Sequence, residues 1–209
     1  MRPIVTLIVA CALALDVMAQ APTSVDASGP SQLIDSAAHI MLRELDANRS
    51  EFKREPKKVY AVIDRVLLPH FDTEYSARLV LGTHWRTATA EQRKRFVDAF
   101  YHSLLYSYGD AIVDFSADRL KVFPVTVAPD ADRATVRSEV KRSNGDKVPV
   151  NYSLRKTPTG WKAWDVTIEG ISYVKSFRED FASEINQKGI DAVIQRLESG
   201  VLKPGKPKA

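Results

Sequence analysis

The sequence predicts an α+β domain in which helices cover one face of an antiparallel sheet. Three observations predict it: apolar residues recur every three or four positions in the N-terminal half, they alternate between residues 119 and 169, and helical spacing returns after Gly170. Helices, then a meander of strands, then helices again is the order expected of this architecture. We expect about four strands, with one sheet face apolar and the other charged.

The N-terminal half reads as a series of helices. Ser31 can cap the first, and Asp72 can cap a short third one. A longer helix begins after Thr89, which forms a capping-box pattern with Gln92. The apolar residues between 96 and 115 are too many for one stripe, so this helix is buried on more than one side or walls a cavity.

The second half reads as strands joined by tight turns. The segments with alternating apolar residues are 119–128, 133–142, 147–156 and 161–169. Asn144-Gly145 is a strong hairpin signal, and residues 157–160 form a second turn. Helices are expected from Ile171 to about Gln187 and again after Gly189.

The helix after Gly170 has an unexpected residue on its apolar stripe. Read at helical spacing, the stripe consists of Ile171, Val174, Arg178, Phe181 and Ile185. A permanent cation on such a stripe requires either a carboxylate partner or an anionic ligand.

The two ends of the chain have the composition of segments outside the fold. Residues 1–20 combine a basic start, an apolar run and small residues, which is typical of a secretory signal peptide. Residues 21–30 read as a flexible leader, 31–200 as a single domain, and 201–209 as a flexible tail. Cys11 is the only cysteine, so the mature domain has no disulfide and depends on its core. In a bacterium with two membranes, we expect the product in the periplasm.

The charge pattern narrows the choice of partners. The net charge is +4, and 27% of residues are charged, which together with export argues against nucleic acid as a ligand. Basic clusters at 52–58 and 92–96 are either solvated helix surfaces or a docking patch for an acidic partner or an anionic membrane. The candidates are Arg54, Lys57, Lys58, Arg93 and Arg95.

The sequence offers little that would support catalysis. Its four histidines are scattered through the helical half without metal-ligand spacing, and we find no phosphate-binding loop, nucleophile elbow or Cys/His set. Asp165 and Glu169 are the carboxylates near the last strand, and we assign both a structural role. We therefore expect no enzyme, no metal and no cofactor. An exported cone-fold hydrolase or isomerase is the alternative.

Two stretches resemble the MlaC (toluene-tolerance) family. Residues 79–112, LVLGTHWRTATAEQRKRFVDAFYHSLLYSYGDAI, are similar to its Leu-Gly-x-x-Trp-Arg and Gln-Arg-x-x-Phe patterns. Residues 161–181, WKAWDVTIEGISYVKSFREDF, are similar to its Trp-Lys-Val-x-Asp-Val signature and the sequence that follows. Ala163 and Phe177 depart from the pattern, in which a larger apolar residue and a tyrosine are expected.

The resemblance implies a periplasmic phospholipid carrier. Proteins of this family pass lipid between an outer-membrane lipoprotein–porin complex and the lipid-binding subunit of an inner-membrane ABC transporter, which maintains outer-membrane lipid asymmetry. A branch associated with hopanoid lipids leaves the ligand class open. We expect a monomer whose sheet and helices enclose an apolar cavity, with phospholipid as cargo. The residues expected to contact lipid are Phe100, Leu104, Tyr108, Val150, Tyr152, Trp164, Val166, Val174, Arg178 and Phe181.

Arg178 has two interpretations at this point. In one, its stem lies along Val174 and Phe181 and its guanidinium pairs with Asp165 or Glu169. In the other, it stands at the cavity mouth and binds the lipid phosphate. The alternative to a lipid cavity is that the same apolar residues form a filled core.

Overall fold

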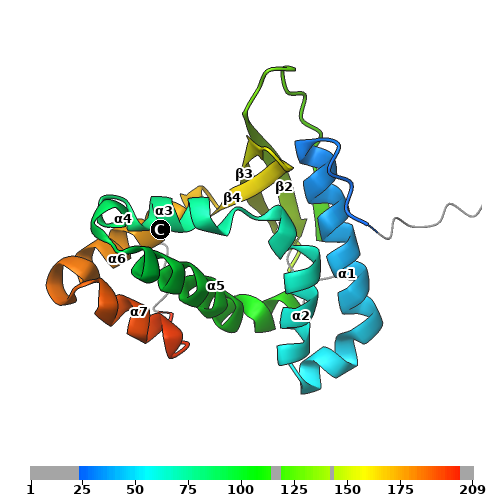
Figure 1. Cartoon of the computed structure of the whole chain (residues 1–209). Helices are drawn as coiled ribbons and strands as arrows, with labels where there is room; N and C mark the ends of the chain where they lie inside the picture. Colours follow the sequence, from blue (N-terminus) through cyan, green and yellow to red (C-terminus); the bar gives the residue numbers. More distant parts are fainter. Residues whose placement is uncertain (1–23, 114–118, 142–143, 203–209) are drawn as a thin grey trace, which may run out of the picture.

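The computed structural model describes residues 24–113, 119–141 and 144–202 (Figure 1). The predicted signal peptide and nearly all of the predicted tail lie outside these ranges. The helices are α1 (Pro30–Arg54), α2 (Lys57–Val66), the 3-10 turn η1 (Leu68–His70), α3 (Thr73–Leu81), α4 (His84–Thr87), α5 (Ala90–Val113), α6 (Tyr173–Lys188) and α7 (Ile190–Glu198). The strands are β1 (Leu120–Val122), β2 (Arg133–Lys141), β3 (Lys147–Thr157), β4 (Gly160–Ile168) and β5 (Ile171–Ser172).

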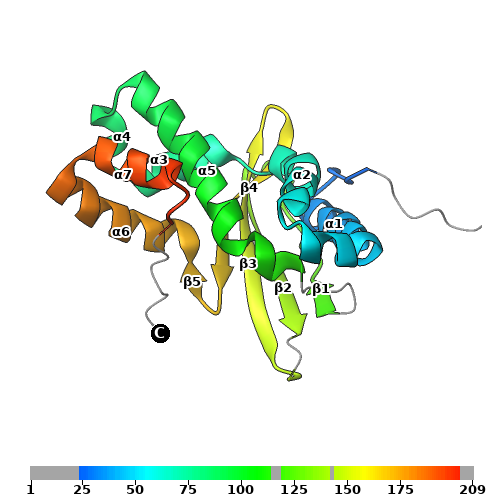
Figure 2. The same cartoon turned by 90° about the horizontal axis from the view of Figure 1, so that it is seen from below.

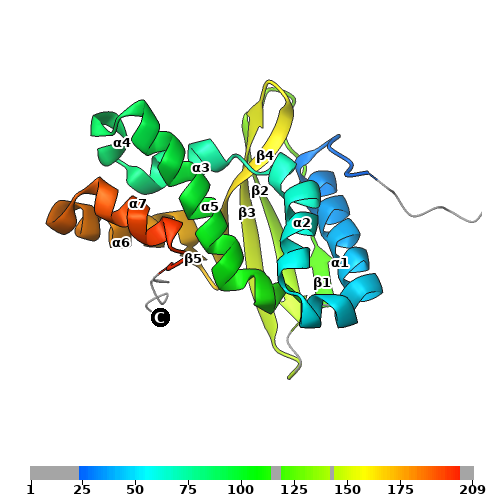
Figure 3. The ribbon, with the colours of Figure 1, turned by 60° about the horizontal axis from the view of Figure 1, so that its bottom comes forward.

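The strands form one antiparallel meander, which confirms the predicted α+β class. Their order in the sheet is β1-β2-β3-β4-β5, so each strand pairs with its neighbour in the sequence. In the central ladder, Val136 lies opposite Tyr152, and Ala134 lies opposite Leu154. These apolar pairs share the face that α1, α2 and α5 cover in Figures 2 and 3, which we call the inner face. The opposite face is the outer face.

The first strand is shorter than predicted. β1 ends at Val122, whereas the alternation continued to residue 128. Phe123 still donates its N–H to the carbonyl of Arg137, but Pro124 has no N–H to continue the ladder. Val125 and Val127 then pack with the cluster of α1 and the inner face. Their alternation therefore reflects packing under a helix and not strand pairing.

A fifth strand occupies the corner where a helix was predicted to begin. Glu169 and Gly170 have φ values of 51° and 84°, and the flanking Ile168 and Ile171 pair with each other. Positive φ at both central residues is the geometry of a type I′ hairpin turn. Helix α6 therefore begins at Tyr173, with Ser172 as its cap: the Ser172 hydroxyl accepts from the N–H of Lys175.

The helix starts follow the predicted capping chemistry at two of three places. Asp72 accepts the N–H of Tyr75 at 3.1 Å and caps α3. At α5, the Thr89 N–H donates to the Gln92 side chain while the Gln92 N–H donates to the Thr89 hydroxyl, as in a capping box. The expectation for Ser31 is wrong, because α1 already begins at Pro30, a residue favoured in a first turn.

The buried apolar residues form three clusters. The helix cluster joins α3, α5, α6 and α7, and includes Phe96 and Val193, both with no exposed surface. The second joins α1, α2 and α5 around Leu45, which is also fully buried. The third joins α1 to the inner face of the sheet. Helix α5 contributes to the first two clusters, which explains its broad apolar face.

Candidate functional site

Four of the predicted lipid contacts lie in the helix cluster. Phe100 and Phe181 are both buried, and their ring centroids are 5.6 Å apart in an edge-to-face arrangement. Phe96 and Phe177 complete a group of four interlocked rings. Leu104 and Val174 pack against this cluster and are partly buried. The rings make the edge-to-face and offset contacts typical of a protein core.

Three others lie on the inner face of the sheet. Val150 is buried, while Tyr152 and Val166, which are opposite each other on β3 and β4, are partly buried. Burial raises the pKa of Tyr152, and a hydrogen bond with Ser138 partly offsets this. Ser138 itself is 1% exposed and donates its hydroxyl to the carbonyl of Val150 at 2.8 Å. The inner face is therefore apolar with one satisfied pair of hydroxyl groups.

Trp164 does not lie with these residues. The ladder between β3 and β4 has a bulge: Leu154 pairs with Ala163, but Ser153 pairs with Asp165. The extra residue is Trp164, so Trp161 and Ala163 occupy the inner face in its place. The Trp164 ring instead meets Tyr75 edge to face at 5.7 Å. The side chain of Tyr108 lies outside the described part of the structure.

Arg178 is not part of the buried stripe of α6. The buried residues of this helix are Phe177, Phe181 and Ile185, so the stripe passes through the neighbouring phenylalanine. Arg178 is exposed, and among the described residues it forms no ion pair. Its guanidinium lies over Gly82, where a Cβ atom would be 3.0 Å from the Arg178 Nε atom. The apolar stripe predicted from the sequence therefore included Arg178, whereas the buried residue of α6 at this turn is Phe177, one position earlier.

Asp165 has partners other than the predicted arginine. It is 5% exposed and accepts the Ser172 hydroxyl at 2.6 Å and the Val174 N–H at 3.0 Å. It thus joins β4 to the first turn of α6, where a carboxylate is also favoured by the helix dipole. The expected structural role is confirmed, and of the two interpretations of Arg178, the one in which it pairs with Asp165 is wrong.

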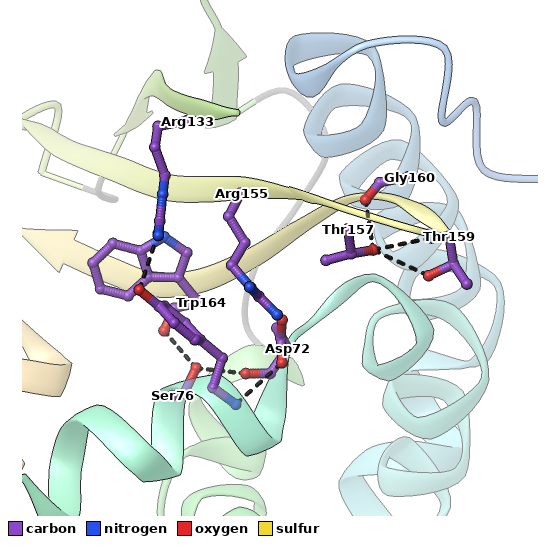
Figure 4. A network of polar contacts seen from close by, with 9 residues as sticks. Asp72, Ser76, Arg133, Arg155, Thr157, Thr159, Gly160 and Trp164 are labelled. Carbon is purple, nitrogen blue, oxygen red and sulfur yellow. Dashed lines mark hydrogen bonds and ion pairs between the residues drawn. The ribbon is translucent and has the colours of Figure 1, made fainter. Parts of the chain in front are cut away.

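A polar cluster around Tyr75 was not foreseen (Figure 4). Arg155 donates to Asp72 at 2.7 Å, and its guanidinium lies 4.3 Å from the centre of the Tyr75 ring. Arg133 donates to the Tyr75 hydroxyl at 3.1 Å. Asp72 therefore both caps α3 and pairs with a strand residue. Its capping role was visible in the sequence, whereas its pairing depends on the placement of α3 against β3 and β4.

Two of the five cations named from the sequence are neutralised by carboxylates, and a third has uncharged partners. Lys58 pairs with Glu51 and Glu55, and Arg95 makes a bidentate pair with Glu198. Arg93 donates to the backbone carbonyl of Trp85 and stacks on its ring. These contacts favour the interpretation of solvated helix surfaces held by local pairs.

The described residues contain no group of three side chains suited to a metal ion. Within the same ranges, no helix is long and apolar enough to cross a membrane. Burial, with a smaller contribution from the charge of Lys162, lowers the pKa of His70. His39 lies beside Asp35 of its own helix, with both side chains about half exposed.

These features define a class of protein: an α+β domain with helices over the apolar face of a five-stranded meander and a charged opposite face. Residues 35–199 match the family described as MlaC protein. The chain belongs to this family.

Individual relatives agree with the family assignment. The chain is 31% identical over 169 residues to the toluene tolerance protein ttg2D of Pseudomonas putida, covering 80% of this chain and 78% of that protein. It is 24% identical over 185 residues to the intermembrane phospholipid transport system binding protein MlaC of Haemophilus influenzae, covering 87% and 86%. A phospholipid-binding protein from Ralstonia solanacearum, solved in complex with a phospholipid, matches with a TM-score of 0.72 and 26% identity over 80% of this chain and 93% of that one.

Proposed function

We propose that this protein binds a phospholipid and carries it across the periplasm, between an outer-membrane lipoprotein–porin complex and the lipid-binding subunit of an inner-membrane ABC transporter. The observation that carries the proposal is the similarity to the Ralstonia solanacearum protein, whose structure holds a phospholipid. Transport is supported by the description of the Haemophilus influenzae relative. The periplasmic location is supported by the signal-peptide pattern in residues 1–20.

The acyl chains are proposed to lie between α5 and the inner face of the sheet. Helix α5 packs on α1, α2, α3 and α7, and no strand is among its main packing partners in the described residues. On the facing sheet surface, Val166 and Ile168 are only partly buried. Apolar side chains on that surface are thus available to a ligand without displacing the helix cluster.

The energetics favour such a site for a carrier. Keeping two acyl chains of about sixteen carbons each out of water is worth about 25 kcal/mol, at about 0.8 kcal/mol per CH₂. A membrane interior offers the chains a similar environment, so transfer between carrier and membrane complex needs little driving force. No reacting group is required, which is consistent with a family of binding proteins.

Phospholipid content tests the proposal directly. The exported, processed protein is purified without detergent, extracted with chloroform and methanol, and analysed by mass spectrometry. We expect near-stoichiometric phospholipid, while another exported protein of similar size purified in parallel carries only traces. Lipid-free protein from repeated preparations would contradict the proposed function, and a hopanoid in the extract would change the ligand class.

Arg178 is the proposed partner of the lipid head group. It is exposed, it has no ion pair among the described residues, and its planar fork suits a phosphate. Arg178→Leu should leave the free energy of unfolding within about 1 kcal/mol of the wild type and lower the co-purified phospholipid several-fold. Lys175→Leu removes an exposed cation from the same helix and serves as the control. Loss of stability in Arg178→Leu, with lipid content per folded protein unchanged, would assign Arg178 a structural role instead.

A further inference from the structure

The outer face of the sheet carries a row of cations on three adjacent strands, two of which also contact the start of α3. In the register of the sheet, Arg133 on β2 lies opposite Arg155 on β3, and Arg155 lies opposite Lys162 on β4. Partners in register point to the same face, so the three side chains form one row across adjacent strands. The row spans about 10 Å, since neighbouring strands lie about 4.8 Å apart.

Only one member of this row is neutralised by a carboxylate among the described residues. Arg155 pairs with Asp72 at 2.7 Å, and its side chain is 32% exposed. Arg133 is exposed and has the Tyr75 hydroxyl and ring as neighbours, both uncharged. The positive charge of Lys162 acts on His70. Burial of His70 and, to a smaller extent, this charge lower the pKa of His70. Like charges directly opposite each other destabilise a sheet, so this arrangement has a cost that an external anion would remove.

The positive charge extends along β2 beyond the row. Arg137 and Lys141 follow at even spacing and therefore share the face of the row, and within the described residues neither forms an ion pair. Glu139, which lies between them, pairs with Lys147 of β3. The only large apolar side chain that is exposed in the described ranges is Val201, near the C-terminus. The outer face thus offers charge without an exposed apolar centre.

This combination favours a membrane surface over an acidic protein. Stable protein interfaces have a centre rich in apolar and aromatic side chains that are free to be buried by the partner. At the outer face the aromatic side chains of Tyr75 and Trp164 are already partly buried, against each other and beneath the arginines of the row. Attraction to anionic lipid needs only accessible Lys and Arg side chains, each contributing independently. We propose that the outer face of the sheet, centred on Arg133, Arg155 and Lys162, docks on the surface of an anionic phospholipid bilayer. The inference rests on the proposed function in one respect: a lipid carrier must approach membranes to exchange cargo.

Vesicle binding tests this docking surface. The exported, processed protein is sedimented with two kinds of vesicle. One kind is pure phosphatidylcholine, and the other is phosphatidylcholine with about 30% phosphatidylglycerol, so that about one lipid in three is anionic. We expect binding to the anionic vesicles only, with loss of binding near 1 M salt, where the screening length is about 3 Å. The test variant is Arg133→Gln/Lys162→Gln, which leaves the pair of Arg155 and Asp72 intact. The partition coefficient of this variant between anionic vesicles and water should be about 20- to 30-fold lower than that of the wild type, because two basic residues are lost.

The control variant is Arg54→Gln/Lys57→Gln, which removes the same charge from exposed positions near the junction of α1 and α2. It should bind anionic vesicles nearly as well as the wild type. An equal loss in both variants, or no loss in the test variant, would overturn the proposal. So would a wild type that ignores anionic vesicles, which would leave an acidic protein as the partner of this face.

Phospholipid content separates this inference from the proposed function. Arg133→Gln/Lys162→Gln should keep its co-purified phospholipid and its unfolding midpoint while losing vesicle binding. Lipid-free wild-type protein that still binds anionic vesicles would contradict the carrier function and support the docking surface. Lipid-loaded wild-type protein that binds neither kind of vesicle would support the carrier function and contradict the docking surface.

Discussion

At the scale of single residues, the buried side chain of Asp165 holds the junction between β4 and α6. One buried carboxylate accepts the Ser172 hydroxyl and the Val174 N–H, while Ser172 in turn accepts the N–H of Lys175. Two of the first free N–H groups of α6 are thereby satisfied, and the helix is held against the end of β4. The orientation of α6, and with it the placement of Phe177 and Phe181, starts from this corner.

Replacing Asp165 by alanine should lower the free energy of unfolding by about 3 kcal/mol, because two charge-assisted hydrogen bonds are lost in a buried site. Asp165→Asn keeps an acceptor for the Val174 N–H and should lose less. Urea denaturation followed by circular dichroism measures both. The control is Glu179→Ala, an exposed carboxylate on the same helix, with an expected change within about 0.5 kcal/mol. A similar loss in the control variant would mean that charge alone matters.

At the scale of elements, the turn from α3 to α4 depends on Gly82. Its φ of 54° and ψ of −119° are accessible to glycine and strained for other residues. The Arg178 side chain lies directly over it, so this turn also positions the one α6 cation proposed to meet the lipid. The turn and α6, which are distant in the sequence, are thus in contact where Arg178 lies over Gly82.

Gly82→Ala should destabilise the protein by about 1–3 kcal/mol from backbone strain, with an added cost from the contact with Arg178. Gly145→Ala is the comparison, because Gly145 also has positive φ but no atom lies within 4 Å of the position that a Cβ would take there. In the Arg178→Ala background, Gly82→Ala should cost less than it does in the wild type. An identical cost in both backgrounds, measured as a double-mutant cycle by urea denaturation, would show that Arg178 does not restrict the turn.

At the scale of the whole molecule, the two faces of the sheet are used differently. The inner face lies against the helices, and its residues Val166 and Ile168 are only partly buried, because no strand is among the main packing partners of α5 in the described residues. The outer face carries basic residues in register across β2, β3 and β4. The same alternation of apolar and charged residues that forms the strands therefore separates the proposed lipid site from the proposed membrane-docking surface.

Much of the fold was accessible from the sequence because the controlling interactions are local. The caps at Asp72 and Thr89 each involve residues three positions apart, and the turns at 144–145 and 157–160 are set by their own residue types. The apolar alternation of 133–141 and 147–157 specifies which residues share a face. These signals sufficed for the α+β class and the meander, and with the resemblance they pointed to the family.

The parts that failed depend on a shift of one residue or on partners far apart in the chain. The bulge at Trp164 moves that residue off the inner face, and the hairpin at Glu169 delays the start of α6 by two residues. Packing of α6 in the helix cluster makes Phe177 and not Arg178 the buried member. Neither shift changes the overall periodicity enough to be seen. The row of Arg133, Arg155 and Lys162 exists only in the register of three strands. Local sequence thus determined the elements and their apolar faces, whereas register and packing decided which side chains meet.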